Sequence, residues 1–100
     1  MLEYRMKRDR RGVPMFVFED NAYALLGEFL LAEGRNFGKE ILSFLEKHKE
    51  QKEPAEFAGN VFRIEVLENE AKVVNDLTDK GCRVPLADLA NVVKDYEELA

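Results

Sequence analysis

The chain has very few of the side chains from which ordinary active sites are built. Its 100 residues include one histidine, one cysteine, one serine and one threonine, which are His48, Cys82, Ser43 and Thr78. Nucleophilic and acid–base catalysis draws on these groups in pairs or triads, and here they lie in different parts of the sequence. We therefore predict that the protein is not an enzyme and that it has no catalytic residue.

The same scarcity argues against a metal or a cofactor. Zinc sites combine several Cys and His ligands at short spacing, whereas His48 and Cys82 stand 34 positions apart. Asp76 and Asp79 lack the regular alternation and the central glycine of a calcium loop. Residues 34–38 lack the spacing of a phosphate-binding loop. We expect His48 to lie at a helix end, Cys82 to pack beneath the last helix, and no metal or cofactor to be bound.

A lone cysteine cannot form a disulfide within the chain, which is typical of a reducing compartment. The N-terminal region lacks the uninterrupted apolar segment of a secretion signal, and the longest apolar stretch, residues 22–32, is interrupted by Gly27 and Glu28. We therefore expect a cytoplasmic protein that does not contact a membrane.

Charge is distributed unevenly along the chain. Residues 1–13 carry five basic and two acidic side chains, a net charge of +3, which leaves −8 for the remainder. A basic segment on an acidic body can contact phosphate or an acidic partner locally. Exposed hairpins are also charged simply for solubility and to discourage edge pairing. The candidate interaction surface is the cluster Lys7, Arg8, Arg10 and Arg11.

The first part of the chain has the pattern of a β-hairpin over residues 2–18. Apolar and charged residues alternate from Leu2 to Lys7, residues 10–12 form a polar turn, and residues 13–18 are apolar on both faces. Pro14 cannot donate a ladder hydrogen bond, so we expect it at the start of the second strand. A second hairpin is predicted over residues 60–76, with its turn at residues 68–70.

Two helices follow from apolar residues at helical spacing, one over residues 38–50 and one over residues 85–99. Residues 21–33 fit one face of a helix and also a kinked strand, so both interpretations stay open, and residues 34–38 read as a break. The layout predicts a single α+β domain over residues 1–100, with helices packed on one face of an antiparallel sheet formed by the two hairpins.

Several short segments resemble the YacL family of small uncharacterised bacterial proteins. They are the opening LEYRMKRD with Gly12, the central FAGNVFRIEV followed by AKVVNDL, and the closing stretch from Cys82 through VPLADLANVVKDYEEL. The similarity is one of layout and short matches and spans most of the chain. It implies a bacterial protein of this kind and no particular mechanism.

Two functions fit these observations. The first is a small acidic binding protein that acts through protein–protein contact, such as a regulator, an adaptor or an immunity-type protein, with another protein or a second copy of itself as the partner. The edge of the second hairpin is where a second copy could pair. The alternative is a nucleic-acid-associated protein in which Tyr4 and Phe16, close to the basic cluster, stack a base.

Overall fold

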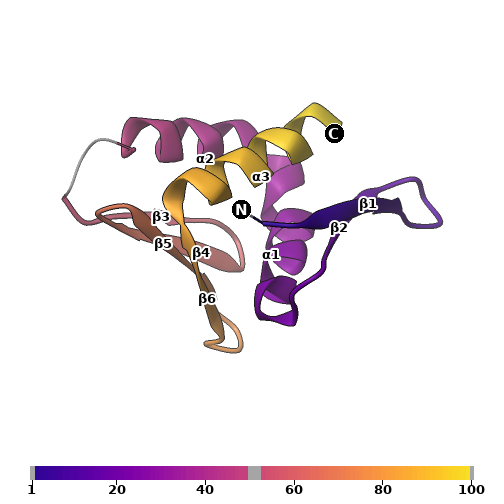
Figure 1. Cartoon of the computed structure of the whole chain (residues 1–100), viewed down its shortest axis with the longest axis horizontal. Helices are drawn as coiled ribbons and strands as arrows, with labels where there is room; N and C mark the ends of the chain where they lie inside the picture. Colours follow the sequence, from indigo (N-terminus) through magenta and orange to yellow (C-terminus); the bar gives the residue numbers. More distant parts are fainter. Residues whose placement is uncertain (1, 50–52, 100) are drawn as a thin grey trace.

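The computed structural model describes residues 2–49 and 53–99. They form a small two-stranded sheet, a four-stranded sheet and a set of helices that packs against both (Figure 1). The strands are β1 (Tyr4–Arg8), β2 (Pro14–Phe18), β3 (Ala55–Ala58), β4 (Phe62–Leu67), β5 (Glu70–Asn75) and β6 (Gly81–Pro85), and the α-helices are α1 (Ala24–Phe29), α2 (Arg35–Lys47) and α3 (Leu86–Leu99).

The predicted α+β class and both predicted hairpins are confirmed, but the hairpins do not share a sheet. β1 and β2 form a sheet of their own, and the second hairpin, β4–β5, lies at the centre of a sheet ordered β3-β4-β5-β6. The expectation that the second hairpin exposes an edge is therefore wrong, because β3 and β6 flank it. Pro14 begins β2, as expected.

Residues 21–33, whose conformation the sequence left open, are helical. They comprise a 3₁₀ turn η1 (Asn21–Tyr23), α1 and most of a π-helical turn η2 (Leu30–Gly34). Asp20 starts this segment, since its Oδ1 accepts a hydrogen bond of 2.9 Å from the Ala22 N–H. Burial decides between the two interpretations, because the four residues that are buried lie on one helical face. They are Leu26, Phe29, Leu30 and Glu33.

The break predicted at residues 34–38 is a kink rather than an end. The chain passes from η2 directly into α2, and only Phe37, with φ −125° and ψ 15°, leaves helical geometry. α2 begins at Arg35 and ends at Lys47, and position 50, the predicted end, lies outside the described residues. The C-terminal helix agrees closely with the prediction, since α3 starts one residue after Pro85.

The helices cover one face of the four-stranded sheet, as predicted. The sheet side chains that face them are fully buried, and so is the apolar stripe of α3. They include Phe62, Ile64, Val66, Val73 and Val84 from the sheet and Leu89, Val92, Val93 and Tyr96 from α3. Within the described part of the chain, no helix is both long and apolar enough to cross a membrane.

A buried carboxylate joins the helical layer to the sheet. Glu33 in η2 is only 1% exposed, and its oxygens accept hydrogen bonds from the backbone N–H groups of Asn60, at 2.9 and 3.0 Å, and Val61, at 3.2 Å. These two residues belong to the turn between β3 and β4. Since a buried charge is stable only with such partners, Glu33 fixes where this turn lies against the helices.

Candidate interaction surface

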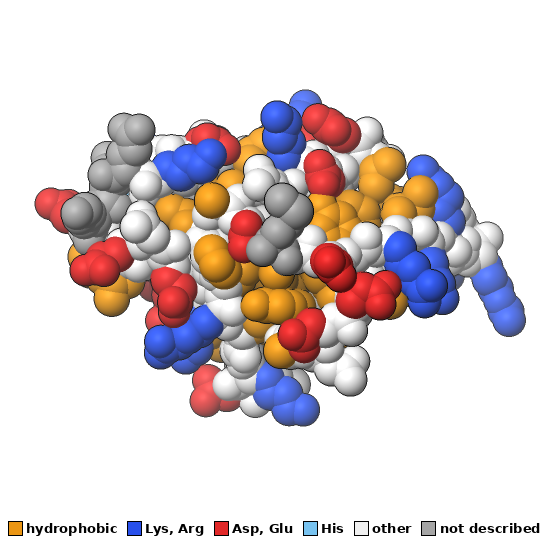
Figure 2. Space-filling view, viewed as in Figure 1, with side chains coloured by type: hydrophobic (Ala, Val, Ile, Leu, Met, Phe, Trp, Pro, Cys, Tyr) orange, Lys and Arg blue, Asp and Glu red, His pale blue; other side chains and the backbone are white. Residues whose placement is uncertain are grey.

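The candidate site is the hairpin formed by residues 4–18, which we call the basic hairpin. All four predicted cations lie on it with exposed side chains, Lys7 and Arg8 in β1 and Arg10 and Arg11 in the turn. Figure 1 places this hairpin at one end of the long axis, and Figure 2 shows Lys and Arg side chains gathered at the same end. The structure thus brings the predicted residues together.

The turn of the basic hairpin is held by its own polar groups. Asp9 Oδ1 accepts hydrogen bonds from the backbone N–H groups of Arg11, at 2.8 Å, and Val13, at 2.9 Å. Gly12 has φ +79°, a left-handed conformation that favours glycine. Arg8 donates from Nη1 to the Gly12 carbonyl at 2.7 Å. These bonds define the turn. The side chains of its two arginines, Arg10 and Arg11, have no acceptor among the described residues.

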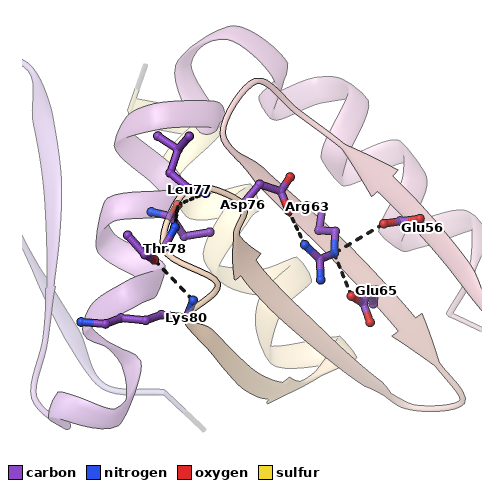
Figure 3. Close-up of polar contacts among 8 residues, drawn as sticks. Glu56, Arg63, Glu65, Asp76, Leu77, Thr78 and Lys80 are labelled. Carbon is purple, nitrogen blue, oxygen red and sulfur yellow. Dashed lines mark hydrogen bonds and ion pairs between the residues drawn. The ribbon is translucent and has the colours of Figure 1, made fainter.

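Three cations elsewhere in the fold, Lys49, Arg63 and Arg83, form ion pairs with carboxylates. Arg63 on the open face of the four-stranded sheet points toward three acidic side chains (Figure 3). Its Nε lies 2.8 Å from Glu65 Oε2 and 3.6 Å from Glu56 Oε1, and Nη1 contacts Asp76. Within residues 2–49 and 53–99, no cation of the basic hairpin forms an ion pair, and the exposed Lys39 and Lys47 of α2 form none either. The charge of the basic hairpin is therefore available to a partner.

The aromatic residues beside the cations are engaged within the fold. The Tyr4 ring stacks on Phe16 with centroids 4.7 Å apart, and it lies 5.3 Å from Phe18. The Tyr4 hydroxyl donates to Asp95 of α3. Partial burial and the Asp95 carboxylate raise the pKa of Tyr4, so the hydroxyl stays protonated in the folded protein. Phe16 is buried and covers one face of the Tyr4 ring, so of the two rings expected to stack a base only the half-buried Tyr4 keeps exposed surface.

The basic hairpin is anchored to the helices through β2. Tyr96 of α3 is buried, packs edge-on against Phe16, and donates from its hydroxyl to the Pro14 carbonyl at 2.9 Å. α1 approaches the same strand so closely that a Cβ at Gly27 would lie 2.8 Å from the Phe16 carbonyl oxygen. These anchors are not predictable from the sequence, because nothing local indicates which strand edge meets which helix.

A shallow groove on the open sheet face, near the β4–β5 turn, is the other candidate surface. Its apolar part includes the exposed Leu67 together with Pro54, Ala55, Val66 and Ala71, and its other lining residues are charged, with both signs present. Its charged side chains are Glu56, Glu65, Glu68, Glu70, Lys72 and Arg83. Four glutamates against one lysine and one arginine give this groove a net charge of −2, opposite in sign to the basic hairpin.

The two residues with the most reactive side chains, Cys82 and His48, are not paired with each other. Cys82 in β6 is buried, and its thiol donates to the Ala22 carbonyl at 3.2 Å. Burial, together with the charge of Asp20, raises the pKa of the Cys82 thiol. His48 is the C-cap residue of α2, so it lies at a helix end as expected, and its ring is 4.8 Å from that of Phe44. Cys82 therefore has neither the lowered pKa nor the neighbouring base of a catalytic thiol.

We expect native Cys82 to react with iodoacetamide at least about a hundredfold more slowly than the same residue in denaturant. The thiol is buried, and its raised pKa leaves little thiolate at mildly alkaline pH. The measurement is the time course of alkylation by mass spectrometry, with the denatured protein as the control. A native rate equal to the denatured one would contradict the buried, hydrogen-bonded thiol.

Among the residues that the structure describes, no group of three or more His, Cys, Asp or Glu side chains is placed to hold a metal ion. No family model matches the chain, and no curated protein and no solved structure is significantly similar to it. The resemblance to the YacL family therefore stays a prediction, and the function has to be inferred from geometry and charge.

Proposed function

We propose that this protein is a small non-catalytic binding protein of the cytoplasm, a regulator, adaptor or immunity-type protein, that contacts an acidic surface of another protein through its basic hairpin. One observation carries the proposal. Exposed cations without a carboxylate partner among the described residues project from a body of opposite charge. Unpaired charge of one sign on a projecting element favours encounter with a partner of the other sign.

The alternative, a nucleic-acid-associated protein, has less support. Recognition of single-stranded nucleic acid combines cations with aromatic rings that stack on bases. The rings beside these cations are packed on one another and on α3. The net charge of −8 outside residues 1–13 also repels a polyanion at long range.

Charge reversal at the tip tests the proposal. We expect the double variant Arg10→Glu and Arg11→Glu to weaken capture of the protein partner from nuclease-treated lysate by roughly tenfold or more. Both side chains are exposed and neither forms an ion pair in the described part of the chain, so the fold should be unaffected. The measurement is quantitative mass spectrometry of tagged pull-downs with the wild type and the variant.

The matched control is the double variant Lys39→Glu and Lys47→Glu, which makes the same charge change on exposed positions of α2. It should retain the partner. Equal retention by the tip variant and the wild type would show that the basic hairpin is not the contact surface. Loss of all captured material on nuclease treatment would favour the nucleic-acid alternative.

A further inference from the structure

The basic hairpin has one covered edge and one free edge, and hydrogen bonds show which is which. The Glu19 N–H donates to the Glu3 carbonyl and the Asp9 N–H to the Val13 carbonyl, both at 3.0 Å. Since bonded pairs alternate along an antiparallel ladder, the odd-numbered residues of β1 bond to β2. The N–H and C=O groups of Tyr4, Met6 and Arg8 therefore point away from β2.

The outer edge of β2 is occupied by the helices. The carbonyls of β2 that point outward belong to Pro14, Phe16 and Phe18. These residues lie opposite Arg8, Met6 and Tyr4 in the ladder. The Pro14 carbonyl accepts from Tyr96, and the Phe16 carbonyl lies against Gly27. No strand lies beyond β1, because the two-stranded sheet consists of β1 and β2 alone in the described chain.

We infer that the free edge of β1 is a docking site for an extended acidic segment of a partner protein, which adds to the basic hairpin as a third strand. The inference rests on the proposed function and specifies how the basic hairpin would be used. Strand addition takes affinity from main-chain hydrogen bonds and specificity from the side chains that alternate across the added strand.

The two faces of β1 require different side chains from such a segment. On one face, Arg5 and Lys7 are exposed and attract acidic side chains. On the other face, a hollow beside the strand is lined by Tyr4, Met6, Phe16, Leu99, Asp95 and Glu98. Met6 is 42% exposed there, and the carboxylates of the hollow disfavour an acidic side chain.

A segment that alternates acidic and apolar residues therefore fits in only one of the two phases of its alternation. Its acidic residues lie beside Arg5 and Lys7, and its apolar residues cover Met6. A slip by one residue would place acidic side chains against Asp95 and Glu98 and apolar ones against the cations. A second copy of β1 fits poorly, because antiparallel pairing centred on Met6 would bring Arg5 of one copy opposite Lys7 of the other.

The probe is a fluorescent peptide of eight residues in which Glu and Val alternate, with both ends blocked. Its first control has the same composition in blocks of two, which destroys the alternation. Its second control is the alternating peptide with N-methyl groups on every second residue, either on all the Glu or on all the Val residues, so that one edge or the other cannot donate to β1. Binding is measured by fluorescence anisotropy at low and at physiological salt.

The protein variants separate main-chain pairing from charge. Met6→Pro removes an outward N–H at a position that does not bond to β2, whereas Met6→Leu keeps it. Lys7→Glu removes charge complementarity, and Lys47→Glu on α2 is its matched control. We expect at least tenfold weaker binding for Met6→Pro, for Lys7→Glu, for the block peptide and for one of the two N-methylated peptides, and wild-type affinity for Met6→Leu and Lys47→Glu.

Several results would overturn strand addition. One is equal binding of the alternating, block and N-methylated peptides, a test that leaves the protein unaltered and so does not depend on the folding of Met6→Pro. Another is tighter binding of a polythymidine oligonucleotide than of the peptide, with an oligonucleotide affinity that Met6→Pro leaves unchanged. If the cellular partner is lost with the Arg10 and Arg11 reversal but retained by folded Met6→Pro, the proposed function stands and strand addition fails.

Discussion

Replacing Glu33 by alanine is expected to lower the free energy of unfolding by roughly 3–5 kcal/mol, because hydrogen bonds to a charged group contribute about 1.5–3 kcal/mol each. The carboxylate serves the backbone N–H groups of Asn60 and Val61, and alanine would leave both without it. The truncation also opens a void at a site that is 1% exposed. Urea denaturation followed by circular dichroism measures the change.

Gly59 supplies an internal check on this explanation. A Cβ at Gly59 would lie 1.8 Å from Glu33 Oε2, so alanine there would displace the carboxylate from its hydrogen bonds. We expect Gly59→Ala to cost about 3 kcal/mol in the wild type. In the Glu33→Ala background it should be nearly neutral, because the obstructing atoms are gone. Equal costs in the two backgrounds would show that the two residues are not coupled.

The second large effect is expected at Gly27. Glycine to alanine inside a helix ordinarily stabilises a protein by about 1 kcal/mol. At Gly27 the new Cβ would meet the Phe16 carbonyl oxygen at 2.8 Å, and a backbone atom cannot move without shifting β2 away from α1. We expect Gly27→Ala to destabilise the protein by about 2–3 kcal/mol, measured by urea denaturation.

Gly38→Ala is the matched control, since it makes the same change inside α2. The nearest atom to a Cβ there, at 2.2 Å, would be Oε2 of Glu97, the end of a flexible side chain that can rotate away. Its effect should stay within about 1 kcal/mol of zero. If both glycines tolerate alanine equally, the close approach of α1 to β2 does not contribute to the stability of the protein.

Local patterning was sufficient for part of the secondary structure. Alternation over residues 2–7 and a polar turn with Gly12 predicted the first hairpin, and the apolar stripe of α3 predicted the last helix. β3 and β6 were missed. β3 is four residues long and half-buried. β6 contains Gly81, which is typical of a loop, and Pro85, which was predicted to begin the last helix, although Cys82 and Val84 do alternate with exposed residues.

The basic cluster was likewise predicted from the sequence, but the arrangement of the hairpin that carries it was not. Charge is a property of composition, so the net charge of +3 over residues 1–13 is evident without coordinates. Which edge of the hairpin is covered depends on Tyr96 and Gly27, which are distant in the chain from β1. The missing N–H of Pro14 weakens the outer edge of β2, but no local pattern shows that the helices cover this edge.

By itself, the sequence determined the α+β class, the two hairpins, the terminal helix, the uneven charge and the scarcity of catalytic side chains, since each of these depends on residue types and their spacing. Tertiary structure alone decided that the hairpins occupy separate sheets and that residues 21–33 are helical. It also decided that Glu33 anchors a turn and that β1 keeps a free edge. These features depend on contacts between segments far apart in the chain, and such contacts follow from the packing of the whole molecule.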